Sequence, residues 1–313
     1  MTIAVGLGFM EFPFSSADSY WKWVMMCEDG HIDSLWQTDR LVSEKPFLES
    51  VSTMAAIAGA TKRIKFGMNV VSVGLRDPLL LAKQCATIDM LSNGRLLPGF
   101  GIGNIKAADW KASNTDTKGR GKRTNEALEI ISRLWNETAI NFEGDYFNYT
   151  GATIMPKPVQ NQLPMWIGGS SKAAIERTAN YGTGWQAGLE TPEEVTPVIK
   201  AIKLALREKN RQIPEDHYGA FFPFHFGSKD NKAVQQIYST FSKKLGIDPD
   251  TRVVVGGAKE IIQRIREFIA AGTSKFILNP IGNSDEEIFD QTSQIILQVL
   301  PLVEELNQNK KKE

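Results

Sequence analysis

Short apolar runs alternate along the chain with longer stretches in which apolar residues recur every three or four positions. The short runs predict buried strands, and the longer period predicts amphipathic helices. The strands are expected at residues 3–9, 34–36, 64–71, 95–100, 165–169, 184–188, 219–226 and 275–280. Eight strand–helix units of this kind predict a single α/β domain over residues 1–305, in which the parallel sheet closes into a (β/α)₈ (TIM) barrel.

The 313 residues exceed the roughly 250 that a barrel of this kind typically uses. We expect two insertions to hold most of the excess. One spans 104–121, after the fourth strand, and the other spans 140–164, before the fifth strand, where a hairpin and a proline-rich connection are predicted. Residues 306–313 end in a basic run and are predicted to be a disordered tail.

Charge and composition exclude several classes of protein. The 36 basic and 36 acidic side chains give a formal net charge of zero, so nothing favours a nucleic acid or an anionic membrane as partner. No apolar run is long enough to span a membrane, and the first residues are typical of a strand rather than of a signal peptide. Cys27 and Cys85 lie in predicted helices and have no metal-ligand spacing. We therefore expect a cytoplasmic protein without a metal.

Active sites of barrels lie at the carboxyl ends of the strands, and this rule selects a short set of candidate residues. They are Asp39 and Arg40, Ser72 and Val73, Gly101, Gly103 and Asn104, Gly168, Gly169, Ser170 and Ser171, and His225. Asp39 is a catalytic candidate because an unpaired carboxylate is rarely buried. Arg40 is expected to bind an anion or, alternatively, to form a surface salt bridge. His225 is expected to move a proton or, alternatively, to be a hydrogen-bonded structural histidine.

Two glycine-containing stretches point to a bound ligand. Gly99, Gly101 and Gly103 fail the G-x-G-x-x-G spacing of a dinucleotide site, so we expect them to let a flat group approach the backbone. Residues 166–175 read as a strand, two glycines and a serine-capped helix start, which is typical of a phosphate cradle. Ordinary N-capping by Ser171 explains the second stretch equally well.

Several segments in their order along the chain resemble the bacterial luciferase-like superfamily, whose members are barrels that use reduced FMN or the deazaflavin F420. They are "DSLWQTDRL" (33–41), "LRDPLLLAKQCATIDMLSNGRLLPGFGIG" (75–103), "PKPVQNQLPMWIGGSS" (156–171) and "YGTGW" (181–185). The resemblance implies that Asp39 lies beside the flavin ring, with Ser72 and Val73 under it. It also implies that residues 101–104 line the ring and ribityl chain, that residues 168–171 hold the phosphate, and that the protein is a homodimer.

The sequence departs from some F420-dependent sugar-phosphate dehydrogenases of the superfamily. Arg40 stands where they carry a histidine, and Lys106 stands approximately where they carry a glutamate. We therefore predict a monooxygenase that receives reduced FMN from a separate flavin reductase and oxygenates a small organic substrate with O₂. An F420-dependent oxidoreductase is the alternative. A non-catalytic flavin-binding protein is the alternative from another class. An apolar mouth is expected from four aromatic residues, Phe9, Trp36, Trp110 and Trp185.

Overall fold

The computed structural model describes residues 2–310, which form two compact units. The first unit contains the described residues up to Trp36, Gln186–Ala201 and the described residues from Pro214 onward. The second unit contains Gln37–Trp185 and Ile202–Ile213. The expectation of one domain over residues 1–305 therefore stays a prediction.

The first unit is built on parallel strands in the order β12-β11-β13-β1-β2. These are β1 (Ala4–Phe9), β2 (Ser34–Gln37), β11 (Tyr218–Phe226), β12 (Val254–Gly256) and β13 (Lys275–Pro280). Its helices are α1 (Ala17–Asp29), α8 (Lys232–Ser239), α9 (Ala258–Ala271), α10 (Asp285–Gln294) and α11 (Leu300–Lys310), with short helical turns at Thr240–Leu245, Pro249–Thr251 and Ile295–Val299. Phe222 of β11 stacks on Phe268 of α9 in the layer between sheet and helices.

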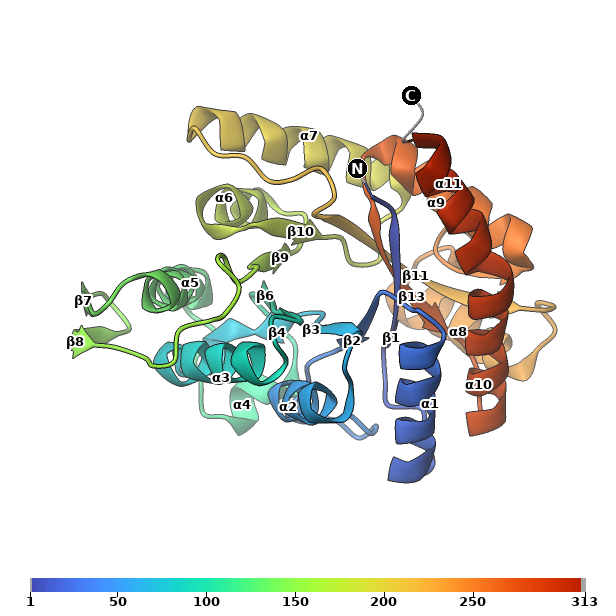
Figure 1. Ribbon diagram of the computed structural model, residues 1–313, viewed down its shortest axis with the longest axis horizontal. Coiled ribbons are helices and arrows are strands. Elements are labelled where there is room, and N and C mark those ends of the chain that lie inside the picture. Colours follow the sequence, from blue (N-terminus) through green and yellow to red (C-terminus); the bar gives the residue numbers. More distant parts are fainter. Residues whose placement is uncertain (1, 311–313) are drawn as a thin grey trace. The chain divides into compact units, whose positions relative to one another are not determined.

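The second unit contains two further groups of parallel strands, β4-β6-β9-β10 and β3-β5. Its strands are β3 (Lys65–Met68), β4 (Val71–Ser72), β5 (Leu96–Leu97), β6 (Gly99–Gly101), β9 (Trp166–Gly168) and β10 (Gly184–Gln186). Its helices are α2 (Ser50–Ala60), α3 (Pro78–Leu91), α4 (Ala108–Ala112), α5 (Arg120–Asn136) and α6 (Lys172–Tyr181), with a 3₁₀ turn η1 (Val73–Leu75). Helix α7 (Pro192–Glu208) has residues in both units. Figure 1 shows α2 beside α3.

Two of the predicted strands are interrupted. The strand expected at 64–71 is divided into β3 and β4 at the cis peptide bond between Asn69 and Val70. The strand expected at 95–100 is divided into β5 and β6 at Pro98, because proline has no N–H group to donate to a neighbouring strand. The sequence pattern also missed two short elements, α4 and β12.

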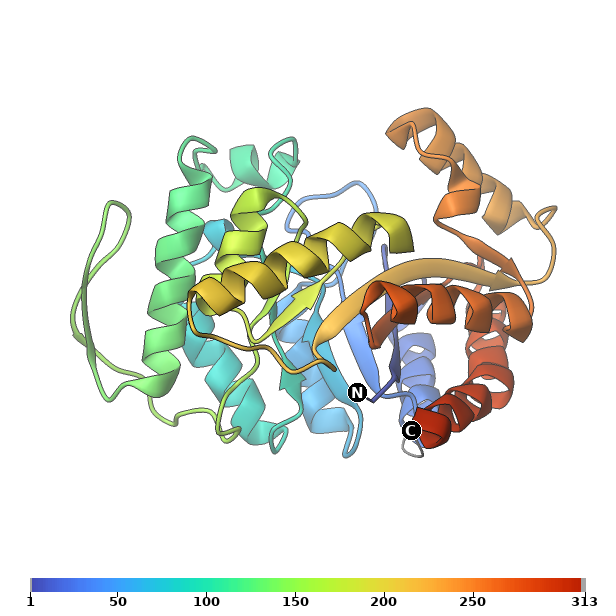
Figure 2. The same ribbon diagram turned by 90° about the horizontal axis from the view of Figure 1, so that it is seen from above.

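The hairpin predicted within 140–164 is present as β7 (Ile140–Glu143) and β8 (Asn148–Ala152), paired antiparallel. Figure 2 shows it alongside α5, where the Glu126 carboxylate accepts the backbone N–H groups of Asp145, Tyr146 and Phe147. Asp77, Ser171 and Ser284 each accept a backbone N–H group at a helix start, and for Ser171 this is the N-capping that the sequence predicts.

The tail expected from residue 306 is helical up to Lys310, because α11 continues that far. Asn307 exchanges two hydrogen bonds with the backbone of Ile3, of 2.7 and 2.9 Å. The expectation of disorder is wrong for residues 306–310, and residues 311–313 lie outside the described residues. Within 2–310, every helix is too short or too polar to cross a membrane.

Candidate active site

Most of the predicted site residues meet at the carboxyl ends of three neighbouring strands of the second unit. Ser72 ends β4, Gly101 ends β6 and Gly168 ends β9, and these strands are adjacent in the sheet. Val73 follows Ser72 and is completely buried. Asn104 is exposed, and its carbonyl oxygen accepts the indole N–H of Trp110 at 2.9 Å.

The glycines at these strand ends make room for Val70. A Cβ atom on Gly101 would lie 2.6 Å from Val70 Cγ2, and one on Gly168 would lie 3.1 Å from Val70 Cγ1. A Cβ on Gly99 would lie 2.2 Å from the Met68 carbonyl oxygen and 3.2 Å from Val70 Cγ1. The group that lies close to these glycines is therefore Val70 of the same chain, where the sequence predicts a flat ligand. Val70 is itself only half buried, so its other side is accessible.

Gly103 has a different reason to be glycine. Its φ is +75°, in the left-handed region that side chains disfavour. A Cβ there would lie 3.0 Å from the Trp110 ring and 3.0 Å from Ser72 Oγ. The Trp110 side chain thus packs against Gly103 and Gly74 and fills the space between the ends of β4 and β6.

The Asp39 carboxylate is saturated with hydrogen bonds from its own unit. Arg76 donates from Nη1 to Oδ2 at 2.8 Å and from Nη2 to Oδ1 at 2.7 Å. Ser50 Oγ donates to Oδ1 at 2.9 Å, and the Ser72 backbone N–H donates to Oδ2 at 3.0 Å. The Asp39 side chain is only 1% exposed. This geometry favours a role in which Asp39 holds neighbouring groups in place over a role in direct proton transfer.

Arg40 is the predicted cation that retains exposure. Its side chain is 38% exposed, and Nη1 lies 3.8 Å from Oδ2 of Asp109. Asp109 is buried, and its Oδ1 accepts the backbone N–H of Leu41 at 2.7 Å, while Oδ2 has no hydrogen-bond partner. The contact is a long ion pair, so Arg40 stays available to an anionic group. The sequence analysis missed Asp109 because α4 was not predicted.

The predicted phosphate cradle has the expected local geometry. Gly169 has φ +104°, a conformation that requires glycine, and its backbone turns the chain from β9 toward α6. Ser171 caps α6 by accepting the N–H of Ala174 at 3.2 Å. The Trp185 indole N–H donates to the Gly169 carbonyl oxygen at 2.9 Å and so holds the loop from β10.

Two arginines of the second unit increase the positive potential of this region. Arg177 of α6 is buried and donates to Asn125 Oδ1 at 2.7 Å and to the Gly121 carbonyl at 3.3 Å. Burial and the neighbouring Arg120 lower the pKa of Arg177. Arg120 Nη1 is itself buried and has no hydrogen-bond partner. Two guanidinium groups side by side, one with an unpartnered N–H group, are the environment that an anion stabilises.

His225 lies at the end of β11 in the first unit, and its side chain is buried. Its Nδ1 is 3.0 Å from the Ile281 carbonyl oxygen, and because a carbonyl oxygen can only accept, Nδ1 is the donor in this hydrogen bond. Phe222 stacks on α9, so alternation along β11 places His225 on the opposite face of the sheet. The contacts fit the structural alternative for His225.

The four aromatic residues expected at an apolar mouth are instead packed in the interior. Phe9 packs on Phe14 and Trp23, and the Trp36 indole donates to Ser34 Oγ at 2.9 Å. Trp110 and Trp185 make the contacts described above and are 3% and 0% exposed. The expectation of an aromatic mouth is therefore wrong, because each ring finds a partner in the core.

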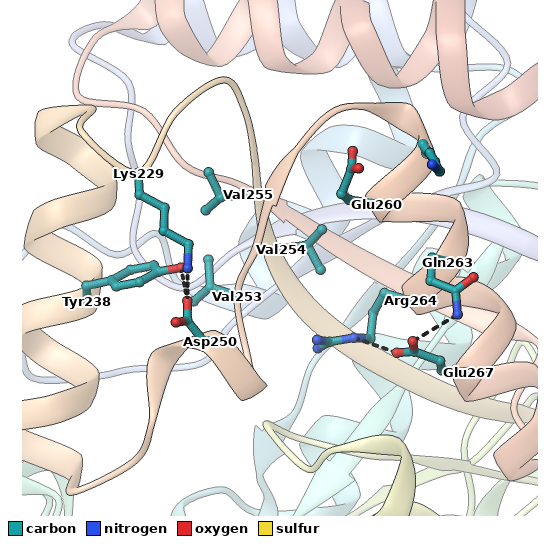
Figure 3. A pocket seen from close by; sticks show the side chains of 11 residues that line it. Lys229, Tyr238, Asp250, Val253, Val254, Val255, Glu260, Gln263, Arg264 and Glu267 are labelled. Carbon is teal, nitrogen blue, oxygen red and sulfur yellow. Dashed lines mark hydrogen bonds and ion pairs between the residues drawn. The ribbon is translucent and has the colours of Figure 1, made fainter.

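A cavity of about 640 Å³ lies in the first unit (Figure 3). Three valines of residues 253–255 line it, and four of its charged side chains form ion pairs, Lys229 with Asp250 and Arg264 with Glu267. Asp250 accepts from Lys229 and from Tyr238, and Glu267 accepts from Gln263 and Arg264. Charges satisfied in this way give no indication of a ligand class.

The chain is similar to known proteins over most of its length. The family model of luciferase-like monooxygenases matches residues 16–275. An F420-dependent glucose-6-phosphate dehydrogenase of Amycolatopsis mediterranei is 24% identical over 314 residues, covering 88% of this chain and 92% of that protein.

Two solved structures show the fold. An F420-dependent secondary alcohol dehydrogenase matches with a TM-score of 0.83 at 18% identity, covering 97% of this chain and 99% of the other. A monooxygenase from Streptomyces bottropensis matches with a TM-score of 0.82 at 18% identity, covering 96% and 99%. The predicted α/β fold with a parallel sheet is confirmed.

Proposed function

We propose that this chain, which belongs to the luciferase-like monooxygenase family, is an oxidoreductase that binds coenzyme F420 or reduced FMN at the strand ends of its second unit. Both cofactors combine a flat ring system with a phosphate, and the second unit offers a place for each part. The substrate is a small organic molecule. Its identity depends on the loops around the strand ends, which differ most between members of a fold.

The observation that carries the proposal is the anion site at the start of α6. The Gly168–Ser171 loop leads into a ten-residue helix, whose first N–H groups attract negative charge. Arg120 and Arg177 add two positive charges without a carboxylate partner, and the unpartnered Nη1 of Arg120 fits a phosphate oxygen. The residues present therefore fit the phosphate of the cofactor.

The ring end of the cofactor fits the accessible side of Val70. Three glycines support the inner side of this valine, so its outer side forms a firm apolar surface. Ser72 lies at the end of the same strand, with its backbone held by Asp39. When bound, the cofactor supplies hydride transfer in the case of F420, or reduction of O₂ in the case of FMN.

The chain's own residues bind and orient the cofactor and neutralise its negative charge. Asp39 fixes the end of β4, and residues 101–104 border the site beside it. Arg40 is the exposed cation, so an acidic group of the substrate or an anionic ring is its natural partner. We assign His225 a positioning role, because its protonated nitrogen is occupied by a backbone carbonyl.

Binding measurements decide between the cofactors. F420 is favoured by the similarity to an F420-dependent dehydrogenase over 88% of the chain. Reduced FMN, supplied by a separate flavin reductase, is favoured by the match to a monooxygenase structure. Purified protein is titrated with F420, FMN and FAD, and oxygen consumption is followed after mixing the reduced complex with O₂. Tight F420 binding without oxygen consumption supports the dehydrogenase, and FMN binding with oxygen consumption supports the monooxygenase.

Two further outcomes test the class of protein. Stoichiometric binding of oxidised flavin without any turnover of reduced cofactor would support the non-catalytic flavin-binding alternative. Failure to bind all three cofactors at micromolar concentration would overturn the proposal. A phosphate-free control, riboflavin in place of FMN, measures the contribution of the α6 anion site directly.

The homodimer is also a proposal, and α2 and α3 support it. Helix α2 has no charged residue in its eleven positions, and Ala55, Ala56 and Gly59 are exposed. Leu80 and Leu91 of α3 are 57% and 70% exposed. Exposed apolar residues that gather on one surface are commonly covered by another chain. A second copy can cover these faces without burying a charge, since a two-fold interface brings identical surfaces together.

A further inference from the structure

The Asp39 carboxylate sits at the centre of a network that reaches the predicted cofactor site. Each of its two oxygens accepts two hydrogen bonds, and three of the four donors are side-chain groups. The fourth is the backbone N–H of Ser72, at 3.0 Å. The position of this last donor therefore depends on how the carboxylate is oriented, and the side-chain donors set that orientation.

Arg76 supplies two of the three side-chain donors. Its guanidinium binds the carboxylate with parallel hydrogen bonds of 2.7 and 2.8 Å, the two-pronged geometry that only arginine provides. The side chains of Arg76 and Asp39 are 12% and 1% exposed. A carboxylate buried to this extent requires a compensating charge, and Arg76 is the cation that pairs with it. Burial alone lowers the pKa of Arg76, but Asp39 and Glu49 outweigh it and raise the pKa.

Glu49 fixes Arg76 from the other side. Its Oε1 accepts Arg76 Nη2 at 2.9 Å, and its Oε2 accepts the Ser52 N–H at 2.7 Å as the N-cap of α2. Arg76 also stands directly before the Asp77 N-cap of α3. The guanidinium is thus anchored at the start of α2 and the Arg76 backbone at the start of α3, which limits the freedom of Arg76 to follow a displaced Asp39.

The segment that Asp39 holds is fixed at its far end as well. The Gly74 carbonyl oxygen accepts Arg123 Nε at 3.1 Å, and the Arg123 guanidinium lies 4.8 Å from the centre of the Phe147 ring. Asp39 therefore holds this segment at the Ser72 N–H group, and Arg123 holds it at the Gly74 carbonyl oxygen. This is the segment that follows Val70 and borders Gly103 and Trp110.

We propose that Arg76 is a positioning residue that orients Asp39 so that Asp39 holds the Ser72 amide and fixes the end of β4 beneath the ring of the cofactor. The inference rests on the proposed function in one respect, namely that the group above β4 is a cofactor. The Arg76–Asp39–Ser72 linkage itself is a property of the chain. Asp39 then acts through the backbone, and neither Asp39 nor Arg76 exchanges a proton with the substrate.

The test compares Arg76→Lys and Asp39→Asn with a matched surface control. Lysine keeps the charge but lacks the two-pronged geometry, and asparagine keeps the shape but offers one acceptor oxygen. Arg133→Lys is the control, because Arg133 of α5 also binds a carboxylate with two hydrogen bonds, from Nε and Nη2 to Glu137 at 2.8 and 3.2 Å, and both side chains are partly exposed. Melting temperature confirms that each variant folds.

Two readouts are measured on each variant. The first is hydrogen–deuterium exchange in peptides covering residues 69–76 of the cofactor-free protein. The second is the dissociation constant for FMN or F420 and for their phosphate-free forms. We expect Arg76→Lys and Asp39→Asn to exchange faster in this segment and to weaken binding at least about tenfold, equally with and without the phosphate. Arg133→Lys leaves both readouts unchanged.

The outcomes separate this inference from the proposed function. If the wild type binds no flavin or deazaflavin, the proposed function fails while the exchange measurement still decides the linkage. If the wild type binds and both variants match it in exchange and affinity, the positioning role is overturned. A loss of affinity confined to the phosphorylated cofactor overturns it too, because that result would place the effect at the α6 anion site.

Discussion

The indole N–H of Trp185 donates a 2.9 Å hydrogen bond to the carbonyl oxygen of Gly169, so the strand that follows α6 holds the loop that precedes it. Both residues belong to the second unit, and Trp185 is completely buried. A Cβ at Gly169 would meet only Ala174, at 3.4 Å. The shape of the loop, and with it of the proposed anion site, therefore depends on an aromatic residue that is buried in the core.

Replacing Trp185 with phenylalanine tests this relationship. The change leaves the Gly169 carbonyl without its buried donor, so we expect a stability loss of about 1–2 kcal/mol. We also expect about fivefold weaker binding of the phosphorylated cofactor, with little change for the phosphate-free form. Trp135→Phe is the matched control, since Trp135 donates to the Ala82 carbonyl at 3.1 Å far along the chain from this loop. Urea unfolding and fluorescence titration measure the two effects.

A second prediction concerns the backbone of the same loop. Gly169→Ala introduces a side chain at φ +104°, which costs roughly 1–2 kcal/mol in strain because the left-handed region disfavours Cβ. The loop relieves the strain by changing conformation, so the phosphate contribution to binding should fall.

Gly151→Ala provides the comparison for Gly169→Ala. Gly151 also has positive φ, +61°, and a Cβ there meets no atom within 4 Å. The hairpin variant should lose similar stability and keep wild-type affinity. Equal losses of affinity in both variants would indicate general destabilisation instead of a specific role for the loop.

The sequence indicates where the site lies but not how it is built. Strand ends could be located because apolar runs end at polar or glycine residues, as at Ser72, Gly101 and Gly168. The glycine spacing shows that some group comes close to the backbone, yet it cannot say which group. Here the group is Val70, brought there by the break between β3 and β4, which no local pattern announces.

The sequence alone does not identify the cation that pairs with Asp39. A buried carboxylate requires a cation, and Arg76 stands between the end of a predicted strand and the Asp77-Pro78 helix start. Long-range pairing of this kind is fixed by tertiary structure, as is the electrostatic influence of Arg120 on the pKa of Arg177. For His225, alternation alone left the direction of the side chain open, and the stacking of Phe222 on Phe268 resolves it.

The proposed dimer predicts a specific effect of charge on α3. Leu80→Glu places two carboxylates on a surface that a second copy would cover, and burying them without partners is costly. We expect the dimer dissociation constant to rise at least about 100-fold, measured by sedimentation velocity. Leu297→Glu is the control, because Leu297 is an equally large exposed leucine, 71% exposed, in the first unit. A wild-type protein that is monomeric at high micromolar concentration would refute the dimer outright.

The link between Glu49 and Arg76 predicts how stability depends on pH. Burial raises the pKa of Glu49, but the hydrogen bonds from Ser52 and Arg76 outweigh burial, and the net pKa lies below its ordinary value of 4.5. A carboxyl group whose folded pKa is lowered stabilises the folded state above its unfolded pKa, and this contribution is lost as the pH falls through the folded value.

Wild type and Glu49→Gln should therefore differ in unfolding free energy at pH 7 and converge below about pH 4, near the ordinary range of glutamate. The magnitude is modest, because the Glu49 side chain is 38% exposed and solvent screens the pair. Urea titrations of both proteins at several pH values measure the difference in unfolding free energy. The other carboxylates are common to both proteins, so their contributions cancel. A difference that stays constant from pH 7 to pH 3 would mean that the Glu49 charge does not stabilise the Arg76 network.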